Sequence, residues 1–369
     1  MFEKTANAPR REIELDFLRG LAILAVVDFH AHYPPIGTIL RWLGLPALGW
    51  AGVDVFFVLS GFLVGGLLVK EWRVNGRIDS KRFLIRRGFK IWPQYYLFLI
   101  VNLFTGHRGW YEMWPAFLNI QNYITRGPAH LWSLAVEEHA YLLLVGFLVL
   151  ASVMALRMRT VFWVLGAASV VVVGLQIAMM LLGKPYFATT HTRVEAIFYG
   201  VMLAILFHCR PEVFRRMQDR RWIWVGGMVT ALLFFRFARN TLPGFLMQFG
   251  MANLIGVCAL ILTYRHRPSL KRSWAYRLVA WIGLYSYGIY LWHVSMMGAV
   301  VNLAAHLPAK ASVIFTVIGE PVLGIALGVL MTKLIEFPAL RLRDRWFPRK
   351  VKSAVEDTPA EVAVLESAN

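Results

Sequence analysis

The run VFWVLGAASVVVVGLQIAMMLL, from Val161 to Leu182, decides the fold class. It contains no charged residue, and about 20 such residues are enough to cross the hydrocarbon core of a bilayer as a helix. The whole chain has a matching composition: 58% of its 369 residues are hydrophobic and 16% are charged, whereas a soluble domain carries about 25% charged residues. This composition excludes a disordered chain and argues against a soluble globule.

Nine further stretches have the same character, so the sequence predicts an all-α, polytopic membrane protein with about ten transmembrane helices. The expected spans are 14–33, 49–69, 88–105, 131–151, 161–182, 190–208, 222–238, 244–263, 278–303 and 312–336. The first is not a cleavable signal peptide, because Asp28 and His30 interrupt it and no small-residue cleavage site follows. We expect a membrane domain over residues 1–345 and a short polar, disordered cytoplasmic tail over 346–369.

Basic residues set the expected orientation. Lys and Arg number 39 against 21 Asp and Glu, and most lie on alternate connections, chiefly 70–90, 210–221, 265–277 and 341–352. The positive-inside rule then places both termini in the cytoplasm. The formal net charge of +18 is explained by topology and anionic lipid head groups, so no nucleic-acid partner is expected. Cys209 and Cys258 lie in apolar stretches and provide neither a disulfide framework nor a thiolate metal site.

Ionisable side chains inside the spans are functional candidates, since each costs about 2.5–3.5 kcal/mol near the bilayer centre on insertion scales. They are Asp16, Arg19, Asp28, His30, Asp54, Glu137, Glu138, Arg193, Glu195, His293 and Glu336. Arg19 and His30 share one helix face and lie about 16 Å apart along the axis. This stripe predicts a lined channel with a cationic cytoplasmic end. Alternatively, Arg19 snorkels to the inner interface and His30 makes one satisfied hydrogen bond.

Three more side chains are expected at the depth of His30. Glu137 lies about 9 Å below the outer surface, His293 about 22 Å above the cytoplasmic start of its span, and Arg193 enters from the outer side. A neutral imidazole beside a carboxylate is suited to general-base work on a hydroxyl. The alternative is that Glu137 and Arg193 only neutralise each other.

A second cluster is expected at the cytoplasmic side, in KRFLIRRGFKIWPQYYL. Its basic residues recur at helical spacing: Arg82, Arg86, Arg87 and Lys90. Guanidinium groups bind phosphates through paired hydrogen bonds, which predicts a site for a phosphorylated donor. A lipid-binding stripe is the alternative. No phosphate-cradling Gly loop and no metal-ligand spacing is present, so no metal is expected.

Seven motifs follow one another along the chain: LDFLRGLAILAVVDFH, GVDVFFVLSGFL, RRGFKIWP, LWSLAVEEHAYL, RVEAIFYGVMLA, SYGIYLWH and IEFPALRLR. Together, from about residue 13 to 343, the chain resembles the integral-membrane acyltransferase-3 family. The resemblance implies a ten-span enzyme that O-acylates extracytoplasmic glycans and related molecules. In this reading the first motif supplies Arg19 and His30 at the family's spacing.

The resemblance also implies roles for individual residues. Catalysis falls to His30, as the base, and to Glu137. Donor binding is expected from Arg19, Arg86, Arg87 and Lys90. Substrate binding is expected from Trp132, Ser133, Arg193, Tyr287, Tyr290 and His293. Three positions depart from the family pattern: Lys90 replaces a common arginine and so loses the bidentate fork, Glu195 replaces an aspartate, and His139 replaces a glutamine.

The expected reaction moves an acyl group, acetyl in the first instance, from cytoplasmic acyl-CoA to a hydroxyl of an envelope polysaccharide or glycolipid. Acyl-CoA is then a donor substrate, no cofactor is bound permanently, and the enzyme lies in the bacterial inner membrane. Many relatives carry an extra hydrolase-like domain, which this chain lacks, so we expect transfer alone or with a separate partner. The alternative is a transporter or flippase whose buried charges form a substrate path.

Overall fold

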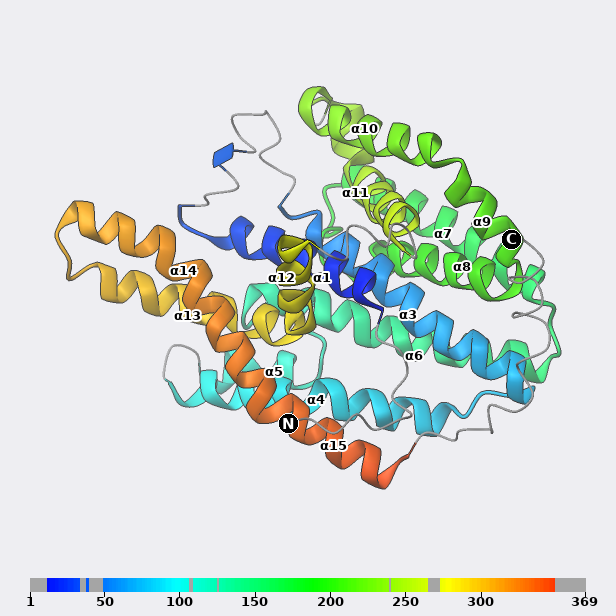
Figure 1. Ribbon diagram of the computed structural model, residues 1–369, viewed down its shortest axis with the longest axis horizontal. Coiled ribbons are helices and arrows are strands. Elements are labelled where there is room, and N and C mark those ends of the chain that lie inside the picture. Colours follow the sequence, from blue (N-terminus) through cyan, green and yellow to red (C-terminus); the bar gives the residue numbers. More distant parts are fainter. Residues whose placement is uncertain are drawn as a thin grey trace.

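All secondary structure in the described part of the chain is helical. The structure, a computed structural model, describes residues 12–33, 38–39, 49–105, 109–124, 126–238, 240–264 and 273–348. Within these ranges it contains helices and no strand (Figure 1). The predicted all-α class is therefore confirmed. Residues 349–369, most of the expected tail, lie outside the described ranges.

The long helices follow the expected spans. They are α1 (Ile13–His30), α3 (Gly52–Asn75), α4 (Ser80–Phe104), α6 (Trp132–Val153), α7 (Met158–Leu181), α8 (Glu195–Cys209), α10 (Arg221–Phe237), α11 (Leu242–Thr263), α13 (Ser286–Ala304) and α14 (Ala309–Met331). Shorter helices connect or extend them: α5 (Trp110–Phe117), η1 (Ala129–Leu131), η2 (Thr190–Thr192), α9 (Pro211–Asp219), α12 (Trp274–Leu284), the π-helix η4 (Thr332–Glu336) and α15 (Phe337–Trp346).

Five helical segments of the described chain are long and apolar enough to cross a membrane: Gly52–Asn75, Ala129–Val153, Met158–Leu181, Leu242–Thr263 and Ala309–Trp346. The number rises to six if α8 and α9, which meet at 111°, form one bent span. The sequence supports the other spans less strongly: α1, for example, carries Asp16, Arg19 and Asp28. The described chain thus contains several candidate membrane spans, and the count of ten stays a prediction.

The expected span 278–303 was predicted as one helix, but the structure divides it. α12 ends before Tyr285 and α13 begins at Ser286. Gly283 packs against the backbone of α1, whereas Gly288 packs against α14 at Gly328. The two halves therefore follow different neighbours, which hydrophobic periodicity alone cannot reveal.

Glycines allow the helices of the bundle to cross closely. A Cβ atom on Gly283 would collide with the carbonyl oxygen of Asp16, and one on Gly20 would collide with the carbonyl oxygen of Val279. Gly61 of α3 meets α8 in the same way. Small residues at such crossings let membrane helices approach backbone to backbone. α12 is therefore fixed against α1.

Helix α1 occupies the middle of the bundle (Figure 1). It contacts α3, α11, α12, α13 and α14. Its core side chains are almost fully buried, as Ile23, Val26 and Val27 show. Both Arg19 and His30 therefore lie on a helix that is surrounded by others.

We expect Gly283→Ala to destabilise the fold. The added methyl group must displace the backbone of α1, and such overpacking costs about 1–3 kcal/mol. The thermal unfolding of the detergent-solubilised protein should shift to lower temperature. Gly298→Ala in α13 is the matched control, because its added Cβ has no atom within 4 Å. Equal melting behaviour of the two variants would contradict the close crossing.

Candidate functional site

Two imidazoles meet where α1 ends. His30 Nδ1 lies 3.3 Å from His293 Nε2 of α13 and 2.9 Å from the carbonyl oxygen of Val26. His293 Nδ1 lies 2.7 Å from the carbonyl oxygen of Tyr290, so this nitrogen carries the proton and His293 Nε2 is an acceptor. His30 Nδ1 then donates to its partners. The remaining nitrogen, His30 Nε2, keeps a lone pair that can accept a proton.

Hydroxyl groups lie beside this histidine pair. Tyr290 of α13 donates to the carbonyl oxygen of His130, and the Ser133 hydroxyl of α6 lies 2.6 Å from the Tyr290 hydroxyl. The rings of His130 and His293 are 5.5 Å apart. The structure therefore brings together four predicted site residues, His30, Ser133, Tyr290 and His293, and adds His130, which the sequence analysis did not single out.

Glu137 was expected beside His30, but the structure gives it other partners. Its Oε2 accepts a hydrogen bond of 3.0 Å from Tyr141 and lies 3.9 Å from Arg87 Nη2. Arg87 also donates to the Tyr141 hydroxyl. A carboxylate in an apolar bundle is drawn to a fixed positive charge more strongly than to a neutral imidazole. Glu137 thus belongs with the basic side chains of α4.

The contacts form a line of polar groups along α6. Ser133, Glu137 and Tyr141 are spaced four residues apart and share one helix face. Ser133 meets Tyr290 at one end, and Tyr141 meets Arg87 at the other. This line joins the histidine pair to the basic cluster without a direct contact between His30 and Glu137.

Three of the four predicted donor-binding residues lie within electrostatic reach of the Glu336 carboxylate. Lys90 of α4 is within electrostatic reach of Arg19 and Arg87, and of Glu336 in the π-helix. Arg19 also lies 3.5 Å from Asp16 on its own helix. π-helical turns are rare and are often found at functional sites. Arg343 of α15 is also within electrostatic reach, so the cluster combines four cations with the buried carboxylate of Glu336.

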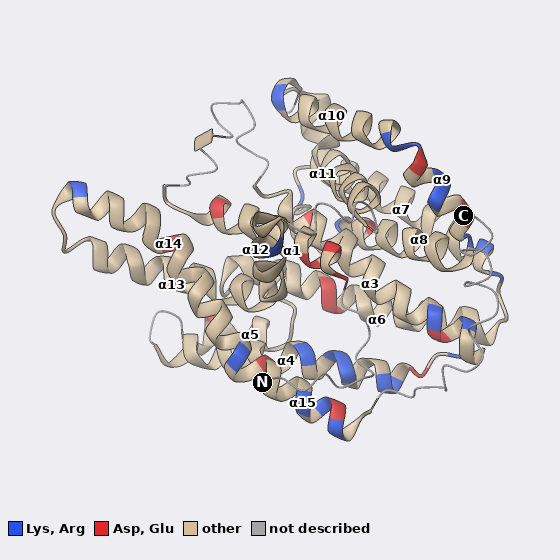
Figure 2. Cartoon of the chain, viewed as in Figure 1, with Lys and Arg blue, Asp and Glu red and all other residues tan. Residues whose placement is uncertain are grey.

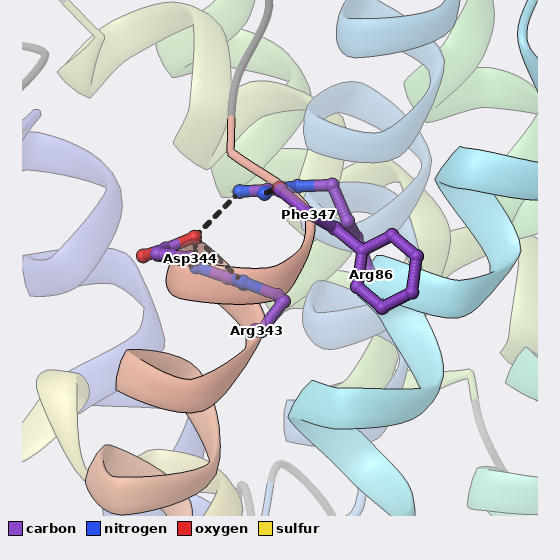
Figure 3. Close-up of polar contacts among 4 residues, drawn as sticks. All are labelled: Arg86, Arg343, Asp344 and Phe347. Atoms are coloured by element: carbon purple, nitrogen blue, oxygen red, sulfur yellow. Dashed lines mark hydrogen bonds and ion pairs between the residues drawn. The ribbon is translucent and has the colours of Figure 1, made fainter.

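Arg86, the fourth predicted donor-binding residue, points elsewhere. Its Nη2 lies 2.9 Å from Asp344 Oδ1 of α15, and the same guanidinium donates to the carbonyl oxygen of Phe347 (Figure 3). Arg343 also donates to Asp344, through Nε to Oδ1 and through Nη2 to Oδ2. Neighbouring residues of a helix are about 100° apart around its axis, so Arg86 cannot face the same point as Arg87.

Arg193 forms a buried ion pair with Asp54 rather than with Glu137. Arg193 Nη2 lies 2.6 Å from Asp54 Oδ1, and both side chains are almost fully enclosed. The guanidinium also stacks on Phe249 at 4.0 Å and lies 5.4 Å from the Trp132 ring centre. Two predicted substrate-binding residues, Arg193 and Trp132, therefore lie close together among aromatic side chains.

Two further contacts complete the placement of the predicted residues. The Tyr287 hydroxyl donates to the carbonyl oxygen of Ile91 at 2.8 Å and ties α13 to α4. Glu320 of α14, which the sequence analysis missed, is completely buried and accepts two hydrogen bonds from His32. Its signal was a carboxylate inside the apolar stretch 312–336. No group of three or more potential metal ligands gathers within the described ranges.

Comparison with known proteins gives the family. The sequence profile of the acyltransferase-3 family, described as an acyltransferase domain, matches residues 12–336. The chain belongs to this family. It is therefore an acyltransferase that moves groups other than aminoacyl groups, and its apolar helices fit a multi-pass membrane protein.

Similar proteins are named as acetyltransferases. The chain is 28% identical to the peptidoglycan O-acetyltransferase OatA of Listeria monocytogenes, over 79% of this chain and 50% of OatA. It is 25% identical to a putative O-acetyltransferase of Staphylococcus aureus strain COL, over 92% of this chain and 60% of that protein. It is 26% identical to the putative peptidoglycan O-acetyltransferase YrhL of Bacillus subtilis, over 76% of this chain and 47% of YrhL.

These matches set two limits. The chain spans about half the length of the curated relatives that it matches. No solved structure gives a significant match to the chain.

We expect Asp54→Asn to destabilise the protein strongly. The substitution removes the carboxylate that is paired directly with the buried Arg193 charge, and breaking a buried pair in this way typically costs about 3–5 kcal/mol. The free energy of unfolding in detergent, or the level of intact protein in the membrane, measures the loss. Asp344→Asn is the matched control: it also removes the carboxylate of an arginine pair, but that side chain is 54% exposed, and such pairs contribute only about 0–1 kcal/mol. Equal losses would contradict the assignment.

Proposed function

We propose that this chain transfers an acetyl group from acetyl-CoA to a hydroxyl group of an envelope glycan, with peptidoglycan as the first candidate. The observation that carries the proposal is the placement of α1, which brings Arg19 to the basic cluster and His30 to the histidine pair. The line of polar groups on α6 runs between these two points. The acetyl group and the glycan are suggested by the names of the similar proteins.

On the donor side, Arg19, Arg87 and Lys90 bind the phosphate groups of acetyl-CoA. Phosphate recognition by guanidinium and ammonium groups fits this set of cations. Glu336 balances part of the charge when no donor is bound. Arg86 acts at a distance from the donor, because Asp344 and Phe347 engage its guanidinium.

On the acceptor side, His30 Nε2 takes the proton of the acceptor hydroxyl. The hydroxyl oxygen then attacks the thioester carbonyl carbon, a new C–O bond forms, and the C–S bond of the donor breaks. The CoA thiolate leaves and recovers the proton from His30. His293 fixes the tautomer of His30 through its Nε2, and the paired hydroxyls of Ser133 and Tyr290 lie beside the reacting groups. Glu137 positions Arg87 and Tyr141.

The proposed topology has ten spans and cytoplasmic termini in the inner membrane of a bacterium. Lys and Arg of the described helices gather on α4, α9, α15 and the end of α3, on one side of the bundle (Figure 2). The positive-inside rule assigns that side to the cytoplasm. The basic cluster then faces the compartment that contains acetyl-CoA, and His30 faces the envelope.

Transport of a glycolipid is the second candidate. The break between α12 and α13 is the kind of interruption that transporters place at their binding sites. Mass spectrometry of surface glycans from a deletion strain separates the two functions. Loss of one ester with unchanged glycan quantity favours the enzyme, whereas loss of the whole glycan favours transport.

We expect His30→Ala to abolish acetyl transfer and leave the protein folded. Removal of the proton acceptor leaves the hydroxyl a poor nucleophile, and general-base catalysis contributes about 10²–10⁴-fold. Purified protein in liposomes, supplied with labelled acetyl-CoA and soluble peptidoglycan fragments, gives the rate. His306→Ala is the control, because His306 is an exposed histidine just beyond α13, and its Nδ1 lies 3.0 Å from the Asn302 carbonyl oxygen. Normal product from His30→Ala would refute the base assignment.

We expect Lys90→Ala to weaken donor binding. A charged hydrogen bond contributes about 1.5–3 kcal/mol, so the KM for acetyl-CoA should rise about 10- to 100-fold. The KM for the glycan should stay constant. Arg159→Ala, an exposed cation in the first turn of α7, is the control and should leave both KM values unchanged. An unchanged KM for acetyl-CoA in Lys90→Ala would place the phosphate site elsewhere.

A further inference from the structure

The structure contains an imidazole–carboxylate contact just beyond the end of α1. α1 ends at His30, the chain continues through Ala31 in an extended conformation, and His32 follows. His32 Nδ1 lies 2.5 Å from Glu320 Oε1, and the His32 backbone N–H donates to Glu320 Oε2 at 2.9 Å. Both oxygens of one carboxylate are therefore used to hold a single residue.

The two partners differ sharply in exposure. The Glu320 side chain, on α14, is 0% exposed, while the His32 side chain is 56% exposed. A buried carboxylate in an apolar helix is costly, and this one has its hydrogen bonds directed at a side chain that faces outward. A contact that served only to join α1 to α14 would need the backbone N–H alone and would not require an exposed imidazole.

The contact fixes the chemistry of the exposed ring. Because a carboxylate oxygen accepts, His32 Nδ1 carries the proton of the neutral ring. Nε2, on the opposite side of the ring, then has a lone pair directed away from Glu320. A carboxylate that orients an imidazole in this way is a recurrent arrangement in sites that receive a hydroxyl proton or hydrogen bond. His30 is held differently, by a backbone carbonyl and by His293.

We propose that His32 and Glu320 form a binding subsite for the hydroxylated acceptor. His32 Nε2 accepts a hydrogen bond from a hydroxyl group of the glycan, and Glu320 is the positioning residue that fixes the imidazole. His32 is two residues from His30 in the chain, so the subsite lies next to the proposed reaction centre. The subsite rests on the proposed function, since it assigns the acceptor to the His30 end of α1.

The test uses the full chain in liposomes, with soluble peptidoglycan fragments as the acceptor probe and labelled acetyl-CoA as the donor. We expect His32→Ala to raise the KM for the fragments about three- to tenfold, the effect of one lost hydrogen bond. The KM for acetyl-CoA and the hydrolysis of acetyl-CoA without acceptor should not change. His306→Ala, the exposed-histidine control, should change neither.

The variant Glu320→Gln distinguishes a role of this contact in acceptor binding from a role in stabilising the fold. It keeps the volume of the side chain and an acceptor for the His32 backbone N–H, but it no longer offers two carboxylate oxygens. We expect the same rise in the fragment KM as in His32→Ala, and no further rise in the double variant, because both residues act through one group. If Glu320→Gln does not fold, His32→Ala decides alone, since its side chain is exposed.

Two results would overturn the subsite. One is an unchanged KM for the fragments in His32→Ala. The other is a lower level of folded protein in both variants with an unchanged KM, which would make the contact a structural link. Direct binding of the fragments distinguishes this failure from that of the proposed reaction. If the wild-type chain binds the fragments through His32 but transfers no acetyl group, the proposed subsite stands. The proposed transfer from acetyl-CoA is then contradicted.

Discussion

A charged side chain within a bundle of apolar helices must find its partner on a neighbouring helix, because hydrocarbon offers none. This constraint determines where the polar groups of the protein lie. Arg193 is paired with Asp54, Arg87 with Glu137 and Tyr141, and Glu320 with His32. Each pair joins two segments that are distant in sequence. The same contacts that allow charges inside the bundle therefore fix the relative positions of the site residues.

The architecture separates the residues proposed to bind the donor from those proposed to bind the acceptor. Cations gather at Lys90 near Arg19, whereas neutral imidazoles and hydroxyls gather at His30. A charged donor head and a neutral sugar hydroxyl require these different surroundings. α1 carries one residue of each group, and the polar face of α6 extends between them. In the proposed reaction, α1 and the polar face of α6 therefore connect the donor residues with the acceptor residues.

The sequence was sufficient for the helical class and for the proximity of His30 and His293, and the reasons are physical. Hydrophobic runs reveal helices in a membrane, and a spacing of eleven residues on one helix places Arg19 and His30 on one face whatever the other helices do. Partners across helices could not be predicted in this way. Depth along separate spans suggested Glu137 beside His30, but depth says nothing about rotation around a helix axis. Arg86 and Arg87 are adjacent in sequence, yet they contact α15 and α6. The contact between Glu320 and His32 could not be predicted, because it joins the two expected spans 14–33 and 312–336, which are distant in sequence.

The close glycine contacts between α1 and α12 fix the position of α1, which its polar residues alone would not do. Because the backbones of α1 and α12 touch at Gly20 and Gly283, α1 has little room to move against α12. In the proposed reaction, the distance from Arg19 to His30 would then set how far the thioester lies from the phosphate groups of the donor. A thioester on a longer or shorter carrier arm would present its carbonyl carbon at the wrong height, whatever acyl group it bears. Discrimination between carriers would come from the length of one rigid helix.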